Sequence, residues 1–152
     1  MGEDVFCLDT SVLIKFLVAE EPVEQGEAAE RLMLRALVGG RVVAPAFAWA
    51  EVGSVLRKKV RQGLLQQQQA EQLWSKFGSL PIEFVDLPAM RDRTWELAEH
   101  YGLATLYDAA FLACTELAPA PEPVVREFWT VDGELLRQLG EMRPPYARLL
   151  GE

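Results

Sequence analysis

Four acidic residues adjoin sequence with the composition of a buried core, and they are the side chains of this chain best suited to chemistry: Asp9, Glu51, Asp108 and Asp132. Asp9 closes the apolar run at residues 5–8, and Asp132 closes the run at 128–131. Asp108 precedes the apolar run at 109–113. A carboxylate next to a core carries a desolvation cost unless another group compensates its charge. A shared divalent cation compensates all four, and oxygen-only coordination suits Mg²⁺ or Mn²⁺. We therefore expect these residues to be the metal ligands of a hydrolytic site.

Each acid also has a structural interpretation. The three aspartates precede or start predicted helices, where Asp is a favoured N-cap. Glu51 has Val55 four residues later and so lacks a basic partner on its own helix. Capping accounts for each aspartate alone, but it does not explain why all four acids adjoin apolar sequence. Brought together without a cation they would repel one another, and at least one would bind a proton more readily than a free carboxylate.

Strands and helices are expected to alternate along the chain. Apolar runs and turn residues predict strands at 5–9, 41–44, 82–85, 127–131 and 146–149, and helices at 12–17, 23–38, 47–61, 66–77, 88–101, 108–117 and 134–139. Gly39 and Gly40 are expected to end the second helix in the usual C-terminal manner. This alternation predicts an α/β fold with a parallel sheet between helices. Ligands bind such sheets beyond the carboxyl ends of the strands, so Asp9 and Asp132 would meet there if the first and fourth strands are neighbours.

Length and charge set limits on the class of protein. A chain of 152 residues is expected to form one domain over residues 1–152. The net charge of −8 argues against passive binding of nucleic acid, which depends on a surplus of Lys and Arg. It does not exclude a nuclease, because bound cations reverse the local field at a site.

Cysteines and apolar runs indicate the compartment. Cys7 and Cys114 lie far apart in apolar sequence, which is typical of reduced core thiols, and with His100 as the single histidine they offer no zinc site. The first residues lack the basic region of a signal peptide, and no apolar run approaches the roughly 20 residues needed to span a bilayer. We expect a cytoplasmic protein that does not enter a membrane.

Four segments, in this order along the chain, give it a resemblance to a known family: Leu8–Leu13, Ala50–Leu56, Tyr107–Ala113 and Trp129–Asp132. Together they resemble the PIN-domain ribonucleases and, within them, the VapC-type toxins of toxin–antitoxin pairs. The resemblance implies a three-layer α/β/α fold around a central parallel sheet. It also implies hydrolysis of RNA with Mg²⁺ or Mn²⁺, by in-line attack of water without a covalent enzyme intermediate.

By matching positions, the resemblance makes Asp9, Glu51, Asp108 and Asp132 the catalytic, metal-binding set. It gives Ser11 and Thr130 supporting roles, as hydroxyls that hydrogen-bond a metal ligand, a water or a phosphate oxygen. The residues after the final aspartate, Gly133-Glu134, depart from the family pattern. Glu134 is therefore a candidate to share or replace the role of Asp132. A helix-start serine and a strand threonine remain the structural alternatives for the two hydroxyl residues.

The densest basic cluster contains Arg57, Lys58 and Lys59, on the same predicted helix as Glu51. One interpretation is an RNA-binding track of phosphate contacts leading to the metal site. The other is a solvated helix end whose cations favour the C-terminal dipole.

The family resemblance further implies a homodimer and a small antitoxin protein as partners. Four apolar residues that look exposed are candidates for such an interface, with core packing as the simpler alternative: Leu64, Leu65, Leu73 and Trp74.

Competing functions remain. A haloacid-dehalogenase-type phosphatase needs a second Asp at the position of Ser11, and a response-regulator receiver needs a late Lys, which is missing after Lys76. Both are disfavoured. A PIN-like scaffold that binds RNA or protein without cleaving, and a housekeeping RNA-processing nuclease, stay open. Divalent-metal binding separates the scaffold from the nuclease.

Overall fold

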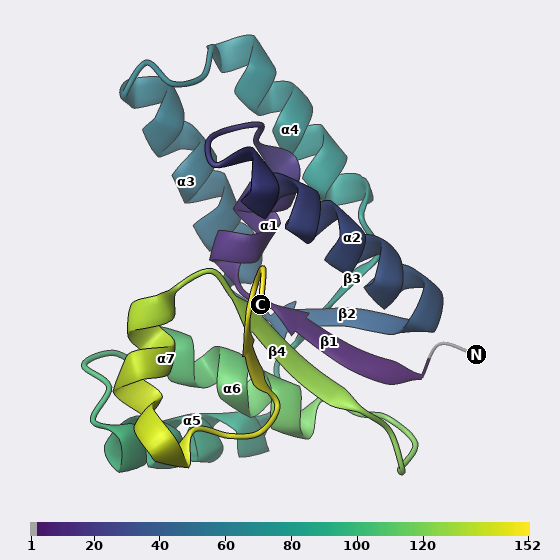
Figure 1. Cartoon of the computed structure of the whole chain (residues 1–152), viewed down its shortest axis with the longest axis vertical. Coiled ribbons are helices and arrows are strands. Elements are labelled where there is room, and N and C mark those ends of the chain that lie inside the picture. The colour runs from purple at the N-terminus through teal and green to yellow at the C-terminus, as the bar shows by residue number, and fades with distance from the viewer. Residues whose placement is uncertain (1–2) are drawn as a thin grey trace.

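The computed structural model describes residues 3–152 and contains one five-stranded sheet with helices on both faces (Figure 1). Its elements follow in the order β1 (Asp4–Leu8), α1 (Thr10–Leu17), α2 (Val23–Gly39), β2 (Gly40–Pro45), α3 (Ala48–Arg61), α4 (Gln67–Ser79), β3 (Ile82–Val85), α5 (Pro88–Tyr101), α6 (Tyr107–Leu117), β4 (Arg126–Thr130), α7 (Gly133–Leu139), the 3₁₀ turn η1 (Gly140–Met142) and β5 (Ala147–Leu149).

The sheet is parallel throughout, with the strand order β3-β2-β1-β4-β5. The first and fourth strands are neighbours, as the meeting of Asp9 with Asp132 requires, and Leu8 pairs in register with Trp129. The chain leaves β1 toward β2 on one side and later returns to β4 on the other. The order of the strands therefore reverses at β1, and this is where a parallel sheet opens a crevice at its carboxyl edge.

Two cores, one on each face of the sheet, make the fold a three-layer α/β/α sandwich. Successive strand residues point to opposite faces. Val5 and Cys7 of β1 accordingly pack against α5, α6 and α7, whereas Phe6 and Leu8 pack against α1, α2 and α3. In Figure 1 α3 and α4 extend away from the sheet on the α1–α2 side, and α5, α6 and α7 cover the opposite face.

Every strand and helix predicted from the sequence is present, with bounds that differ by two residues or fewer. The structure adds one element that was not predicted, the short turn η1. The two glycines end α2, as predicted, but not in the usual left-handed conformation. Gly39 is the last residue of α2, and Gly40 begins β2 in extended backbone with φ −171°. A Cβ at Gly40 would lie 2.1 Å from the backbone oxygen of Asp4, so close strand packing, and not a left-handed turn, requires glycine here.

Among residues 3–152, none of the helices has both the length and the apolar character needed to cross a bilayer.

Candidate functional site

Asp9 lies at the carboxyl end of β1 and starts α1. Its backbone N–H donates to the Trp129 carbonyl at 3.1 Å, which ties it to β4. Its Oδ1 accepts from the Val12 N–H at 3.2 Å, the N-cap bond of α1. The residue is only 6 % exposed. Asp9 is thus an N-cap, as one interpretation of the sequence predicted, and also a nearly buried carboxylate.

Ser11 and Thr130 surround the same carboxylate. The Ser11 hydroxyl donates to Asp9 Oδ1 and accepts from the Val131 N–H at 3.2 Å, so it links the start of α1 to the end of β4. Thr130 is fully buried, and its hydroxyl accepts from the Asp132 N–H at 2.9 Å. The structure therefore brings both residues into the hydrogen-bond network that joins Asp9 to Asp132.

Glu51 is half-buried in the first turn of α3 and faces the start of α1. Its Oε1 accepts a hydrogen bond from the Thr10 hydroxyl at 2.7 Å. Sequence reasoning missed Thr10 as an orienting residue. A signal was present, because Thr10 stands between Asp9 and Ser11 and its hydroxyl points to a different side of the helix start than that of Ser11.

Asp108 occupies the first turn of α6, half-buried, and Leu106 is the N-cap residue of that helix. The capping interpretation was therefore wrong for Asp108. It was right for Asp9 and for Asp132, whose Oδ1 accepts from the Glu134 and Leu135 N–H groups at 2.9 and 3.2 Å.

Burial raises the pKa of Asp9 to about 6. Hydrogen bonds from Ser11, Thr130 and the Val12 N–H lower that pKa, and the negative charge of Asp108 raises it further. Removal from water disfavours the charged carboxylate more strongly than these donors favour it.

Asp108 is the electrostatic centre of the four acids. Burial raises the pKa of Glu51, with the Thr10 hydrogen bond opposing and the charge of Asp108 adding to the rise. Burial also raises the pKa of Asp108, and the charge of Asp132 adds to it. Asp108 thus lies close enough to Asp9, Glu51 and Asp132 for its charge to interact with theirs, although the four acids come from distant parts of the sequence. No cationic side chain in the described residues contributes to the pKa shifts of Asp9, Glu51 or Asp108.

As the side chains stand, residues 3–152 contain no group of three His, Cys, Asp or Glu residues placed to hold one metal ion. The donor set still fits Mg²⁺ or Mn²⁺ chemically, because it is all carboxylate and its negative charge is uncompensated. Mg²⁺ takes only one or two protein carboxylates directly and keeps several waters. A site of this kind does not require three convergent carboxylates.

Glu134 turns away from this group. It is exposed and pairs with Arg137 one helical turn later. Asp132, and not Glu134, acts on the pKa of Asp108. The candidate role of Glu134 therefore has no support from its placement.

The three basic residues of the predicted RNA track point in different directions, since successive helix residues rotate by about 100°. Lys59 Nζ pairs with Glu20 Oε2 at 2.8 Å, and its side chain is 14 % exposed. Arg57 faces α4. Lys58 is exposed seven residues after Glu51, a spacing that returns to nearly the same helix face. Lys58 alone extends outward from the side of α3 that carries Glu51.

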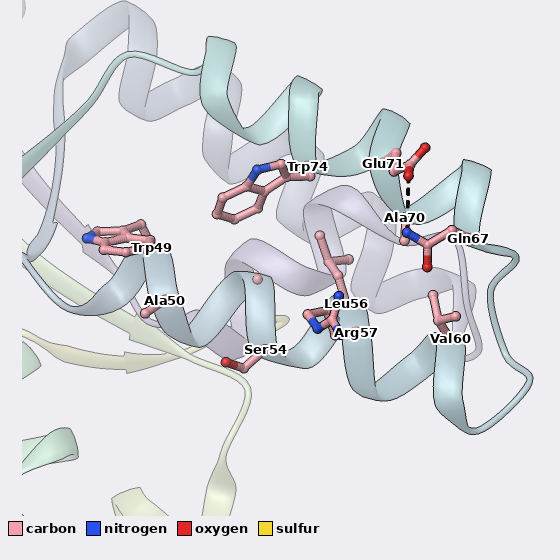
Figure 2. A pocket seen from close by; sticks show the side chains of 11 residues that line it. Trp49, Ala50, Ser54, Leu56, Arg57, Val60, Gln67, Ala70, Glu71 and Trp74 are labelled. Atoms are coloured by element: carbon pink, nitrogen blue, oxygen red, sulfur yellow. Dashed lines mark hydrogen bonds between the residues drawn. The ribbon is translucent and has the colours of Figure 1, made fainter.

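A groove of about 390 Å³ separates α3 from α4 (Figure 2). Trp49 lies at one end, and the ring of Trp74 covers Gly53, where a Cβ would lie 3.0 Å from that ring. Trp49 and Glu51 are two residues apart, a rotation of about 200°, so this groove and the acids lie on different sides of α3. Of the four candidate interface residues, Leu64 and Trp74 are exposed, whereas Leu65 and Leu73 pack against the core.

Comparisons with known proteins agree with this architecture. The sequence model described as PIN domain matches residues 6–121. The comparison with curated proteins gave no match. Solved structures with the same fold include PAE2754 from Pyrobaculum aerophilum, with a TM-score of 0.64 and 21 % identity over 97 % of this chain and 90 % of that one.

Two further solved structures share the fold at 16 % identity. One is VapBC2 from Rickettsia felis bound to a promoter DNA fragment, with a TM-score of 0.56 over 95 % of this chain and 96 % of that one. The other is VapC20 from Mycobacterium tuberculosis, a sarcin–ricin loop cleaving toxin, with a TM-score of 0.58 over 87 % and 93 %. At these identities the likeness establishes the fold, and the chemistry has to be argued from the site.

Proposed function

This chain belongs to the PIN domain family, and from that premise we propose that it is a metal-dependent endoribonuclease that hydrolyses RNA phosphodiester bonds. The observation that carries the proposal is a group of four acids at the carboxyl edge of β1 and β4, in which the charge of Asp108 acts on Asp9 and Glu51 and the charge of Asp132 acts on Asp108. Burying several carboxylates next to one another costs free energy, from desolvation and from repulsion, unless a bound cation offsets their charge. We assign Asp9, Glu51, Asp108 and Asp132 as the residues that hold it.

The chain's own residues divide the work at this site. Asp9 is the buried anchor, fixed by the Ser11 hydroxyl and the Val12 N–H. Glu51 and Asp108 are half-exposed and reach the solvent side, where a phosphate can approach. What a bound Mg²⁺ or Mn²⁺ supplies is positive charge against the phosphate and the charge that develops on it.

Lys58 is our candidate for the phosphate contact nearest to Glu51. Arg57 faces the groove toward α4, so it is a candidate only for a phosphate contact away from the acids. Lys59 and Lys15 are both held by Glu20, at 2.8 and 3.3 Å, and are less available to RNA. Lys58→Gln is expected to weaken RNA binding and flatten its salt dependence, whereas Lys59→Gln is expected to change it less. Equal salt slopes for wild type and Lys58→Gln would remove Lys58 from the interface.

We further propose that the chain is the toxin of a toxin–antitoxin pair, with a small antitoxin protein as partner and a homodimer as its assembly. The support is the fold shared with VapBC2 and VapC20, together with the exposed apolar surface at Trp49, Leu64 and Trp74. Buried cysteines without disulfides fit the cytoplasm as its location. The housekeeping nuclease and the non-cleaving scaffold are the alternatives.

The deciding experiment is incubation of total cellular RNA with wild type and with Asp9→Asn, in Mn²⁺, Mg²⁺ or EDTA, followed by mapping of new 5′ ends. New ends that need the metal and are absent with Asp9→Asn are expected, and their positions identify the RNA. A folded protein that binds Mn²⁺ and cleaves no RNA would contradict the nuclease. Loss of Mn²⁺ binding as well would favour the scaffold.

A further inference from the structure

An exposed aromatic ring stands next to the electrostatic centre of the acids. Tyr107 immediately precedes Asp108 at the start of α6 and is 58 % exposed. Exposed aromatic rings are the surfaces on which proteins stack unpaired nucleic-acid bases. We propose that Tyr107 is a stacking platform for an unpaired RNA base beside the cleaved phosphate; this inference rests on the proposed ribonuclease function.

The ring of Tyr107 is held in place from beneath. It meets the ring of Phe47 edge to face, with centroids 5.4 Å apart at 74°. Phe47 in turn meets Phe111 at 5.8 Å and 88°, and Phe111 is buried in the core. Edge-to-face pairs of this geometry are attractive. The chain of three rings therefore fixes an exposed side chain against the core, so little conformational freedom is lost when a base stacks on it.

The same contact joins the two helices that carry half-exposed acids. Phe47 is the residue before α3, and its carbonyl accepts from the Glu51 N–H at 3.3 Å, one turn along. Tyr107 is the neighbour of Asp108 on α6. The aromatic pair thus links the start of α3, which carries Glu51, to the start of α6, which carries Asp108. In the proposal, a nucleotide whose phosphate lies at these acids places its base on the Tyr107 ring at the start of α6.

Charge explains why a stacking contact suits this chain. The protein carries a net charge of −8, and Lys15 and Lys59 are both held by Glu20. Electrostatic attraction to phosphate is correspondingly weak. Stacking of a base on an aromatic ring adds affinity without positive charge and accepts every base, because each has a π face. Single-stranded RNA is the form that presents unpaired bases.

The test uses the full-length protein and an oligoribonucleotide that spans a cleavage site mapped in total RNA. Tyr107→Leu is expected to lower kcat/KM roughly tenfold or more, whereas Tyr107→Phe keeps the ring and the activity. Removal of the base next to the cleaved bond should lower wild-type kcat/KM by a similar factor. Tyr107→Leu should cleave the abasic substrate with the same kcat/KM as the intact one, because the two changes remove the same contact.

Trp95→Leu is the matched control, because Trp95 on α5 is 60 % exposed but does not adjoin an acid of the site. Unchanged activity of Tyr107→Leu, additive losses, or an equal loss in Trp95→Leu would overturn the inference. A change of oligomeric state in Tyr107→Leu would assign the ring to a contact between copies and also overturn it. Failure of the wild type to cleave any RNA with metal present would instead reject the nuclease itself.

Discussion

Two buried carboxylates on neighbouring strands, Asp9 after β1 and Glu127 in β4, have opposite surroundings. Glu127 is 8 % exposed and accepts from Arg35 Nη2 at 3.0 Å and Trp129 Nε1 at 2.8 Å, with Arg148 Nε at 3.9 Å. Asp9 is as deeply buried, but hydroxyls, a backbone N–H and another acid surround it. A buried carboxylate that is paired with arginines has a structural role, whereas one without a cationic side chain beside it is available to a cation from solution.

The Glu127 cluster also shows how a protein removes the cost of a buried charge. The guanidinium carbons of Arg35 and Arg148 lie 5.6 and 6.0 Å from the centre of the Trp129 ring. The two cations that neutralise Glu127 therefore also pack against the Trp129 ring. Among the described residues that shift the pKa of Asp9, none is a cation. The difference makes distinct predictions for the two sites.

The largest expected difference is in metal binding. At a Mn²⁺ concentration about a hundredfold above Kd, a ligand of the native state adds about 2.7 kcal/mol to the free energy of unfolding. For a domain of this size that raises Tm by roughly 5–10 °C. Thermal unfolding with and without Mn²⁺ should show this rise in wild type and in Glu127→Gln, and little of it in Asp9→Asn. An equal rise in Asp9→Asn would separate Asp9 from the metal site.

The second difference is in pH dependence without metal. The pKa of Asp9 is raised to about 6, so the native state binds the proton more tightly than the unfolded chain does. The free energy of unfolding should therefore fall as the pH rises from about 4 to about 6 and stay lower above that range. Asp9→Asn should be about 1–3 kcal/mol more stable than wild type near pH 7.5, and no more stable near pH 4. Urea unfolding at both pH values measures this. A variant that is less stable at neutral pH would assign Asp9 a structural role.

Glu127→Gln should change stability in the opposite direction. The amide keeps the shape and the acceptor for Trp129, but it loses the ion pairs with Arg35 and Arg148. Because both arginine side chains are half-exposed, we expect a loss of only about 1–2 kcal/mol in urea unfolding at neutral pH. RNA cleavage should be unaffected. A gain in stability would mean that desolvation of the Glu127 carboxylate costs more than its ion pairs with Arg35 and Arg148 contribute.

The smallest predicted effect concerns Thr10. Thr10→Val keeps the shape but removes the hydrogen bond to Glu51, worth about 1 kcal/mol, so we expect cleavage to slow about fivefold with little change in Tm. Thr10→Ser restores a hydroxyl and should restore the rate. Measurement of kcat and KM for both variants checks this. If Thr10→Ser is as slow as Thr10→Val, the hydroxyl does not orient Glu51.

Local patterns in the sequence were enough to predict the α/β fold, its strands and its helices. The alternation of apolar residues and the turn-forming residues act within a few positions of one another, and the bounds of the elements follow from them. The acids were also visible, because each interrupts or adjoins apolar sequence. The proximity of Asp9 and Asp132 required only that parallel strands end at one edge and that the first and fourth strands be neighbours, which the strand order confirms. The places of Glu51 and Asp108 depend on how α3 and α6 pack against the sheet.

Contacts between distant residues were decided by the tertiary structure alone. The sequence does not state that Glu20 holds Lys59, 39 positions away, that Thr10 orients Glu51, or that Gly40 must pass within 2.1 Å of Asp4. It also favoured Asp108 as a cap, whereas the helix begins earlier and leaves that carboxylate among the other acids. The identity of the acids is a local property, but the charge each one experiences depends on what the fold places beside it.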